Sequence, residues 1–526
     1  MKEILKNSFY QLILLYSIVL FLISLGFLWK YSLQFHILAI VIGFFGFFLI
    51  NKEEVNKKIN GFLEGFLIFF SLFLMLFFRL IPYKNGSVPL GYDLGLYRYA
   101  ILHGLEFKDL WILRGGMEPG FLYLMEILKI IFDVDFILKV VFLFFSLLLG
   151  ISIWIYTRRS FGKLAGTISL IIYSLSVVQF KVFSFLYYKN VIALSLLFFS
   201  LLLLNLYEKK RRLRDLVSFV LLSGMIGAIH RPTFYLFGLS FFLYSLIRPY
   251  KKGNYDFKEF GKMCIAGFLI LGIALSFYLG DFFQSITDIL PFVLGSFISP
   301  GESPGTFISF GEYVFLVLAY LPFSIIGFFY IIRNKKELFL SIIVIVNLII
   351  VYFQLFFFNR FIIYLDVFFI ILSGIGFSVL INKKIKLGLF VLIIVIFSLA
   401  MGNYHESSNS LSILNNSQID FIRDIKQNVE ENSSIISISS EYSPYLIGYL
   451  DFNGRRIIAP GLFDSNLWNE SEWDKFWKSG DIQEVKEMLK EYDKPIYVYS
   501  GTKSFNNPCF EVYIDKMEGK LYKYSC

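Results

Sequence analysis

The sequence has 526 residues, of which 57% are hydrophobic, 20% aromatic and only 17% charged, and its mean hydropathy is +0.66. A soluble protein of this length carries about a quarter charged residues, so the composition excludes an ordinary soluble enzyme. Repeated apolar runs of about twenty residues instead predict a polytopic α-helical membrane protein.

The net charge of +9 is unevenly distributed along the chain. Residues 403–526 hold 13 Lys and Arg against 19 Asp and Glu, whereas residues 1–402 hold 36 against 21. The excess cations lie in short connections between apolar runs, where the positive-inside rule expects them on the cytoplasmic side. The basic charge therefore indicates the lipid bilayer as a partner and excludes nucleic acid.

About thirteen apolar segments are predicted to span the membrane. They are residues 8–28, 33–50, 60–81, 136–156, 164–179, 190–206, 216–230, 233–247, 263–280, 313–332, 338–357, 361–381 and 387–402. Alternate connections are basic, and the clearest is the KKRRLR cluster that begins at Lys209. For a protein of the plasma membrane, this pattern predicts a cytoplasmic N-terminus, and an odd number of spans then places the C-terminus outside.

Three long segments are predicted to lie outside the membrane. The first, residues 82–135, contains the stretch GYDLGLYRYAILHG and then an amphipathic interfacial or re-entrant helix that begins near Pro119. The second, residues 281–312, is an apolar loop rich in Pro and Gly, of the kind that forms a lid or a binding loop. Both loops belong to a predicted transmembrane catalytic domain, residues 1–402, and the third segment, residues 403–526, is predicted to be a soluble extracytoplasmic domain.

The C-terminal segment alternates helical with strand-like pieces, which predicts a small α/β domain. Helices are expected near 418–431, 444–450 and 482–492, strands at 434–439, 456–458 and 495–500, and a hairpin that turns at 518–519. Cys509 and Cys526 both lie on the predicted outer side and enclose a short loop, so we expect a disulfide between them. Cys264 lies in a predicted span and is expected to be a small apolar side chain.

Asp93 lies just beyond the third predicted span, ahead of a helix-like pattern of apolar and aromatic residues. A carboxylate at the membrane boundary is costly if it faces lipid and useful if it lines a cavity. In the functional interpretation, Asp93 removes the proton from an acceptor hydroxyl or orients that hydroxyl. In the alternative, its carboxylate only caps the following helix through the amide of Gly95 or Leu96.

Glu118 is the second external acid, and it directly precedes Pro119. It is either a functional residue or an ordinary negative charge that the helix dipole favours at an N-terminus. Two carboxylates from separate loops could share a substrate hydroxyl or a divalent metal such as Mg²⁺ or Mn²⁺. The sequence has no Walker A loop, no GxSxG motif and no cluster of His and Cys, so ATP-driven transport and zinc proteolysis have no support.

Several cations are expected at the outer face of the membrane. His230 and Arg231 mark an outer turn between two spans, and Arg360 stands at the outer end of another span. The planar guanidinium suits a lipid-linked phosphate, whereas the alternative is an interfacial Arg that only extends its charge toward the headgroups. Further cations expected near this face are Arg79, Arg98, Arg114, Lys181 and Lys189.

With these motifs in this order, the chain resembles the GT-C superfamily of polytopic glycosyltransferases, which take sugars from polyprenyl-phosphate donors outside the membrane. The stretch that starts at Asp93 is similar to the first-loop pattern of that family, with Gly95, Tyr97 and Ala100 at the expected spacing. Further positions that look like those of the family are Glu118-Pro119-Gly120, Tyr187-Tyr188-Lys189-Asn190, His230-Arg231-Pro232-Thr233 and Arg360-Phe361-Ile362-Ile363-Tyr364.

The resemblance implies that Asp93 is the catalytic acid/base residue, with Glu118 as the second catalytic candidate. It also implies inversion at the sugar carbon and a hexosyl or pentosyl donor of the dolichyl-phosphate-mannose type. The aromatic and acidic signature of oligosaccharyltransferase tails is missing, which favours transfer of a monosaccharide to a lipid, glycan or protein. The candidate substrate-binding residues are Arg98, Arg114, Lys189, His230, Arg231, Arg360 and Tyr364.

Two other functions are alternatives to the transfer of a sugar from a polyprenyl phosphate. An O-antigen-type polymerase or ligase also has many spans, external arginines and a large outer loop, but there the arginines would carry catalysis and Asp93 would be dispensable. A lipid-linked glycan transporter or flippase usually has repeated halves with broken spans. The sequence shows no such repeat, and a large external tail suits an enzyme better.

Overall fold

The structure is a computed structural model, and its described residues form two compact units. The described residues are 2–25, 32–47, 59–86, 88–104, 117–251, 254–278, 308–355, 358–450, 456–460, 468–478, 481–492 and 495–526. Unit 1 comprises Met1–Ile81, Glu118–Phe121 and Phe142–Asn409, and unit 2 comprises Pro82–Met117, Leu122–Val141 and Ser410–Cys526. Most of the first predicted outer loop therefore clusters with the C-terminal tail.

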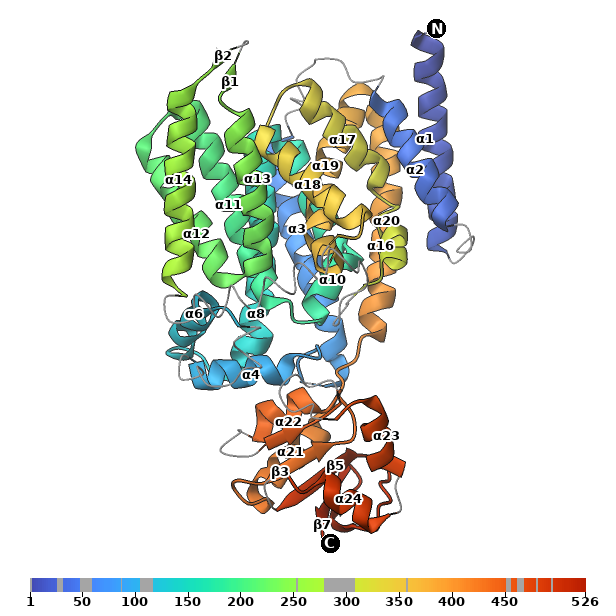
Figure 1. The fold of residues 1–526 in the computed structure, drawn as a ribbon. Helices are drawn as coiled ribbons and strands as arrows, with labels where there is room; N and C mark the ends of the chain where they lie inside the picture. The colour runs from blue at the N-terminus through green and yellow to red at the C-terminus, as the bar shows by residue number, and fades with distance from the viewer. Residues whose placement is uncertain are drawn as a thin grey trace. The chain divides into compact units, whose positions relative to one another are not determined.

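Unit 1 is built of helices, because an apolar segment inside a membrane must satisfy its backbone N–H and C=O groups internally. They are α1 (Lys2–Ser24), α2 (Ser32–Phe47), α3 (Gly61–Leu80), α8 (Phe142–Phe161), α9 (Lys163–Leu175), α10 (Val177–Ser184), α11 (Tyr188–Lys210), α12 (Leu213–Ile229), α13 (Arg231–Ile247), α14 (Phe257–Ser276), α16 (Phe310–Leu316), α17 (Leu321–Arg333), α18 (Leu338–Tyr352), α19 (Phe358–Lys383) and α20 (Ile385–Asn409). Helices α12, α13 and α14 run side by side (Figure 1), and a hairpin of β1 (Tyr250–Lys251) and β2 (Asn254–Tyr255) joins the last two.

Each of the thirteen predicted spans overlaps one of these helices or a helix pair. Among the described residues, seven helices are long and apolar enough to cross a membrane, and two bent pairs raise the number to nine. The pairs are α9 with α10, bent by 53°, and α16 with α17, bent by 82°. The predicted class of polytopic helical membrane protein is confirmed, and the count of thirteen spans stays a prediction.

Helix α19 lies in the core of unit 1, and the apolar window that marks it as a span is 100% buried. Glycines let its neighbours approach closely, as is common between helices in membranes. A Cβ atom added to Gly327 of α17 would lie 1.9 Å from the Leu372 carbonyl oxygen of α19. A Cβ atom on Gly374 of α19 would lie 2.5 Å from the Ala165 carbonyl oxygen of α9. The windows of α3, α14 and α20 are only 22–28% buried, as expected for helices that face lipid.

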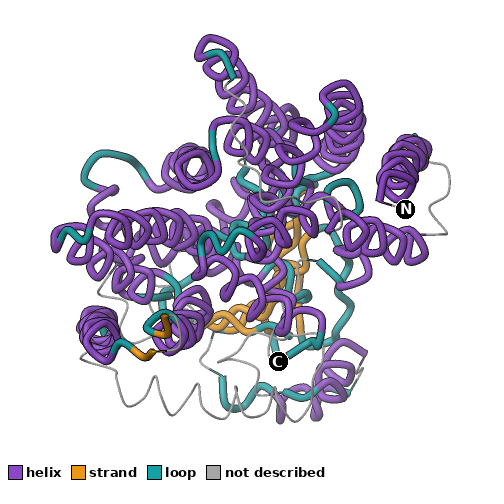
Figure 2. The backbone as a smooth tube through the Cα atoms, turned by 90° about the horizontal axis from the view of Figure 1, so that it is seen from above, coloured by secondary structure: helices purple, strands orange, loops and turns teal. Residues whose placement is uncertain are grey.

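Unit 2 contains a five-stranded sheet of order β4-β3-β5-β7-β6, whose strands are drawn in orange in Figure 2. The strands are β3 (Ser434–Ser437), β4 (Arg456–Ile458), β5 (Ile496–Gly501), β6 (Phe510–Lys516) and β7 (Gly519–Tyr524). Strand β3 pairs in parallel with β4 and β5, with Ile436 opposite Ile458 and Val498, and β7 pairs antiparallel with β5 and β6. The helices of the tail are α21 (Asn416–Asn428), α22 (Ser443–Leu450), α23 (Glu470–Lys478) and α24 (Ile482–Met488). The predicted α/β character of the tail is confirmed.

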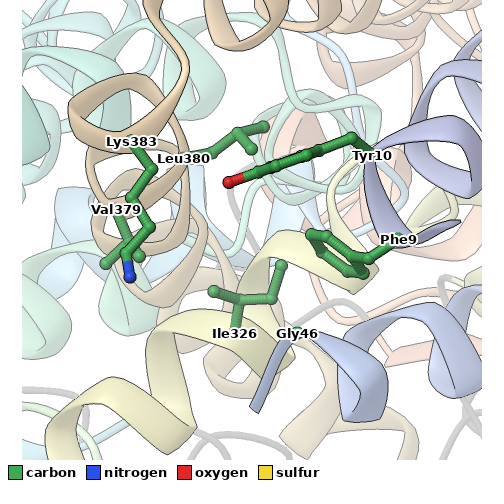
Figure 3. Close-up of a pocket in the computed structure, with 7 residues that line it drawn as sticks. All are labelled: Phe9, Tyr10, Gly46, Ile326, Val379, Leu380 and Lys383. Carbon is green, nitrogen blue, oxygen red and sulfur yellow. The ribbon is translucent and has the colours of Figure 1, made fainter. Parts of the chain in front are cut away.

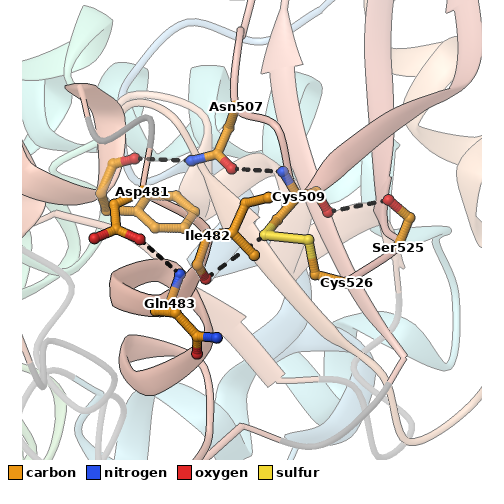
Figure 4. The surroundings of a disulfide bond; sticks show 8 residues. Asp481, Ile482, Gln483, Asn507, Cys509, Ser525 and Cys526 are labelled. Carbon is orange, nitrogen blue, oxygen red and sulfur yellow. Dashed lines mark hydrogen bonds between the residues drawn. A yellow bond between two sulfur atoms is a disulfide. The ribbon is translucent and has the colours of Figure 1, made fainter.

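A disulfide joins Cys509, just before β6, to Cys526 at the C-terminus (Figure 4), and the two Cα atoms are 5.0 Å apart. The amide of Cys509 donates to the Asn507 side chain at 3.0 Å, and the amide of Ser525 donates to the Cys509 carbonyl at 2.9 Å. The bond therefore ties the end of β7 to the loop that precedes β6.

The first outer loop forms short helices. They are η2 (Ile81–Asn85), α4 (Leu94–His103), α6 (Pro119–Lys129), α7 (Val134–Phe136) and the π-helical turn η4 (Ile137–Val141). The predicted helix start near Pro119 agrees with the first residue of α6. The first turn of α6 belongs to unit 1, and the rest of α6 and all of α4 belong to unit 2.

Candidate functional site

Glu118 lies in unit 1, directly before α6, and is only 2% exposed. The ammonium of Lys189, in the first turn of α11, is 2.7 Å from Glu118 Oε2. The backbone N–H of Arg231, the first residue of α13, donates to Glu118 Oε1 at 3.1 Å, and the Arg231 Nε lies 3.7 Å from the same oxygen. One carboxylate therefore joins the N-terminal ends of three helices.

Close packing around α6 explains why these ends meet. A Cβ atom on Gly120 would lie 2.7 Å from the Ala228 carbonyl oxygen, so the first turn of α6 touches the backbone of α12. Tyr188 is fully buried, with its ring centroid 5.7 Å from that of Phe121 and 4.3 Å from that of Phe142. These aromatic contacts hold the start of α11, and with it Lys189, beside Glu118.

His230 forms the cap of α13, and its ring is part of a buried polar network. Its Nδ1 lies 2.8 Å from the Thr233 hydroxyl and accepts from the Thr233 amide at 3.4 Å. The hydroxyl of Tyr364 lies 3.1 Å from Thr233 Oγ1 and 3.3 Å from His230 Nδ1, and the Asn190 side-chain amide donates to it at 3.2 Å. The network fixes the turn that carries Arg231.

Arg360 lies in the first turn of α19 and is partly buried. Its positive charge acts on Lys189, His230 and Tyr364. The structure thus brings together six of the residues singled out in the sequence. They are Glu118, Lys189, His230, Arg231, Arg360 and Tyr364, and we call them the Glu118 group.

The electrostatics of the group separate the roles of its members. Burial raises the pKa of the Glu118 carboxyl, but the positive charges of Lys189 and Arg231 outweigh burial and lower the pKa to about 2. Glu118 is therefore ionised at physiological pH, and both of its oxygens are engaged. A carboxylate in this state is a weak proton acceptor, but it is well suited to hold two cations in place. With Arg360, the group carries three cations and one carboxylate, an excess that favours an anionic ligand.

Asp93 lies in unit 2, immediately before α4, and is partly exposed. The capping alternative requires its carboxylate to accept a hydrogen bond from the first turn of α4. Within the described part of this loop, the Asp93 side chain makes no such capping bond. The functional role of Asp93 stays a prediction.

The other predicted site residues lie outside the Glu118 group. Arg98 belongs to α4 in unit 2, where its Nε pairs with Asp135 Oδ1 at 3.2 Å. Arg114 lies outside the described residues, as does most of the 281–312 loop, of which only residues 308–312 are described. Thr233 and Asn190 belong to the polar network, although the sequence assigned them no role. The signal in the sequence was their place at the ends of the motifs Tyr187-Tyr188-Lys189-Asn190 and His230-Arg231-Pro232-Thr233.

A divalent metal does not fit the Glu118 group. Lys189 and Arg231 repel a second cation at this point and already occupy the carboxylate oxygens. In the part of the chain that the structure describes, no group of three His, Cys, Asp or Glu side chains could hold a metal ion. We therefore derive no step through a metal.

A small cavity lies in unit 1 between α1, α2, α17 and α19 (Figure 3). Its volume is about 10 Å³, and Phe9, Tyr10 and Ile326 are among its lining residues. This is about the space that one water molecule needs, so the cavity is too small for a sugar.

Comparisons with known proteins found a matching family model and similar solved structures. Residues 118–278 match the family described as dolichyl-phosphate-mannose-protein mannosyltransferase. The match begins at Glu118 and contains Lys189, His230 and Arg231. No curated protein sequence matches the chain.

Two groups of solved structures share the fold. The oligosaccharyltransferase AglB from Archaeoglobus fulgidus, in complex with an inhibitory peptide and a dolichol-phosphate, has a TM-score of 0.60 and 14% identity over 83% of this chain and 69% of that chain. The same archaeal enzyme in complex with Zn and sulfate has a TM-score of 0.60 and 16% identity, over 83% and 68% of the two chains. ArnT from Cupriavidus metallidurans, bound to undecaprenyl phosphate, has a TM-score of 0.56 and 11% identity over 87% and 98% of the two chains.

Proposed function

We propose that this chain, an integral membrane protein with the GT-C fold, is a glycosyltransferase that moves a sugar from a polyprenyl-phosphate donor to an acceptor at the outer face of the membrane. The Glu118 group is the observation that carries the proposal. Glu118 is buried against Lys189 and Arg231, and all three residues lie inside the segment that matches the family described as dolichyl-phosphate-mannose-protein mannosyltransferase. Arg360 of α19 adds a third positive charge, which acts on Lys189 and His230. An excess of positive charge at an outer membrane edge suits a phosphate headgroup.

The cations have two tasks in this proposal. Arg231 and Arg360 present planar guanidinium groups to the donor phosphate, and Lys189 adds a compact positive charge. When the bond between the sugar and the phosphate breaks, negative charge grows on the leaving phosphate. Fixed cations stabilise that charge more than they stabilise the bound donor, which lowers the barrier. Glu118 is a positioning residue that holds Lys189 and Arg231 in place.

Asp93 is the proposed base. The acceptor hydroxyl attacks the anomeric carbon, its proton moves to the Asp93 carboxylate, and the electron pair of the broken bond stays on the phosphate oxygen. Attack from the side opposite the phosphate inverts the configuration. The place of Asp93 directly before α4, in the stretch that is similar to the first-loop pattern of the GT-C superfamily, supports this role.

We further propose that the N-terminus is cytoplasmic and that the C-terminal domain is extracytoplasmic. The alternating basic connections support this orientation. This orientation puts the N-terminal ends of α11, α13 and α19, which carry Lys189, Arg231 and Arg360, on the side where the acceptor would arrive. The acceptor is a lipid, a glycan or a protein.

The test is transfer by the purified protein in proteoliposomes. The donor is a radiolabelled polyprenyl-phosphate hexose, and a membrane extract of the native host supplies the acceptor. We expect Asp93→Asn to lower the transfer rate about 10²–10⁴-fold, as removal of a general base does. Asp133→Asn is the matched control, because the Asp133 side chain caps α7 in the same loop and Asn caps equally well.

Full activity of Asp93→Asn would remove Asp93 from the mechanism and favour a polymerase or ligase with catalytic arginines. If the wild-type protein accepts only a sugar on a lipid diphosphate as donor, that finding would also favour a polymerase or ligase. Movement of the labelled lipid across the bilayer without covalent transfer would identify a flippase.

A further inference from the structure

We propose that the C-terminal domain positions the catalytic carboxylate, because helix α22 holds α4 and the loop that carries Asp93. This inference deepens the proposed function and rests on the role of Asp93 as the base. The residues that carry it all belong to unit 2. They lie on α4, on α22 and on the segment just before α22, and the two helices pack together (Figure 1).

The first observation is a contact between the backbones of the two helices. A Cβ atom on Gly95, two residues after Asp93, would lie 1.7 Å from the Pro444 carbonyl oxygen. A Cβ atom on Gly448 would lie 2.4 Å from the Gly95 carbonyl oxygen. Only glycine at both positions permits this approach, so the first turn of α4 is fixed by the surface of α22.

The second observation is a pair of hydrogen bonds on the other side of Asp93. The hydroxyl of Tyr445, which is fully buried, donates to the Gly91 carbonyl at 3.1 Å. The hydroxyl of Tyr92 donates to the Ser440 carbonyl at 2.9 Å. Gly91 has a φ of 103°, a conformation that favours glycine, and the Tyr445 bond holds the chain in that turn. The C-terminal domain therefore touches the backbone on both sides of Asp93.

The third observation concerns Arg98, one turn farther along α4. Its Nη1 donates to the Gly448 carbonyl at 2.6 Å, and its guanidinium lies 4.5 Å from the centre of the Tyr449 ring. Its Nε pairs with Asp135, whose other oxygen lies 3.6 Å from Arg423 Nη2 in α21. In this position Arg98 is a positioning residue that locks α4 to the tail, and we assign it that role in place of substrate binding.

The functional consequence follows from how small a displacement of a catalytic group the reaction tolerates. A displacement of about 1 Å in a catalytic group can reduce the rate about 10²-fold. A carboxylate on a loop needs support from surrounding residues to stay within that tolerance. The C-terminal domain supplies that support, so its loss would affect turnover rather than donor binding.

The experiment measures kcat and the donor KM with the radiolabelled polyprenyl-phosphate hexose. Tyr445→Phe removes only the hydroxyl that holds Gly91, and we expect kcat to fall about fivefold, the effect of one net hydrogen bond. Gly448→Ala forces α22 away from Gly95. Because a displacement of about 1 Å in a catalytic group can cost about 10²-fold in rate, we expect kcat to fall about tenfold or more. The donor KM should stay within about twofold of wild type in both variants, because the Glu118 group is unchanged.

Each variant has a matched control. Tyr513→Phe removes a hydroxyl that donates to the Asn428 carbonyl at 3.1 Å within the tail, far in the chain from Asp93. Gly86→Ala adds a Cβ atom that meets nothing within 4 Å. Both controls should keep the wild-type kcat, and thermal unfolding should be the same for Tyr445→Phe and Tyr513→Phe. If Gly448→Ala does not fold, Tyr445→Phe alone decides the question.

A double-mutant cycle separates positioning from general loss of structure. If Tyr445 acts through Asp93, the residual rate of Asp93→Asn should not fall further when Tyr445→Phe is added. Suppose that Asp93→Asn has lost most of its activity, so that the proposed base stands. The inference is then overturned if Tyr445→Phe and Gly448→Ala both keep the wild-type kcat, or if they change only the acceptor KM. Full activity of Asp93→Asn would instead overturn the proposed base, and this inference with it.

Discussion

Glu118 shows how the surroundings of a residue decide its role. The sequence presents it as an external acid beside a proline, which fits a catalytic group as well as a helix end. In the structure it is buried between Lys189 and Arg231, and its pKa lies at about 2. Its two oxygens are committed to cations that belong to different helices. Its chemistry is therefore that of a counter-ion, and the base in the proposed mechanism is Asp93.

The cations of the group should control donor affinity. Hydrogen bonds to charged groups contribute about 1.5–3 kcal/mol, so Arg231→Ala should raise the donor KM about tenfold or more. Arg231→Lys keeps the charge but loses the planar fork, and it should restore only part of the affinity. Arg333→Ala, at the basic end of α17, is the control. An unchanged donor KM together with an unchanged kcat in Arg231→Ala would exclude Arg231 as a phosphate ligand.

The lowered pKa of Glu118 predicts a pH dependence of stability. The carboxyl ionises at 4.5 in its reference state and at about 2 in the folded protein, so the folded state favours the ionised form. This stabilisation is fully present above pH 4.5 and is lost as the pH falls from 4.5 toward 2.

Thermal unfolding in detergent micelles between pH 7 and pH 3 measures this effect. Glu118→Gln leaves two buried cations without their partner, and we expect a loss of about 3–5 kcal/mol at pH 7. The difference between Glu118→Gln and wild type should shrink as the pH falls. The exposed Glu511→Gln is the control. A difference that stays constant down to pH 3 would contradict the ion pairing of Glu118.

At the scale of elements, glycines determine how the helices of unit 1 pack. Gly327 of α17 touches the backbone of α19 at Leu372, and Gly376 of α19 touches the backbone of α17, with a would-be Cβ 2.0 Å from the Phe323 carbonyl oxygen. The two helices thus meet through reciprocal glycines. In the sequence these residues are indistinguishable from Gly272 of α14, whose Cβ would meet nothing within 4 Å.

The contrast between these glycines is testable. Gly327→Ala inserts a methyl group into a backbone contact and should lower the free energy of unfolding by about 1–3 kcal/mol. Gly272→Ala adds the same methyl group in open space and should leave stability unchanged or raise it by about 0.5–1 kcal/mol, because Ala favours the helix. Thermal unfolding followed by tryptophan fluorescence compares the two. Equal stabilities would show that α17 and α19 are not in close contact.

At the scale of the whole molecule, the orientation of the chain decides where the reaction occurs. Cys509 and Cys526 form a disulfide in the C-terminal domain, which suits an oxidising compartment outside the cytoplasm. Closing a loop of this length stabilises the domain by about 3 kcal/mol on the loop-entropy model.

Labelling of intact cells tests the orientation. After treatment with a membrane-impermeant reductant, an impermeant maleimide should label Cys509 and Cys526 in a Cys264→Ser background. A cysteine at the basic connection, Lys209→Cys, should react only after the membrane is permeabilised. The opposite pattern would place the C-terminal domain in the cytoplasm and refute the proposed orientation.

The sequence by itself determined the membrane class, the positions of the helical segments, the α/β character of the tail and a set of candidate charged residues. These properties depend on composition and on the spacing of apolar residues, and both can be read from a short stretch of the sequence. It left open which members of the set work together, and it could not tell which of the two external acids, Asp93 and Glu118, is buried against cations.

Only the tertiary structure decided those questions. Lys189 and Arg231 reach Glu118 across 71 and 113 residues of chain, and Arg98 reaches Gly448 across 350. Such contacts depend on which helix ends and which glycines meet, and no local pattern encodes that pairing. The same physical reason separates the two acids. Packing places Glu118 between cations in unit 1, whereas it leaves Asp93 partly exposed on a loop that the C-terminal domain holds in unit 2.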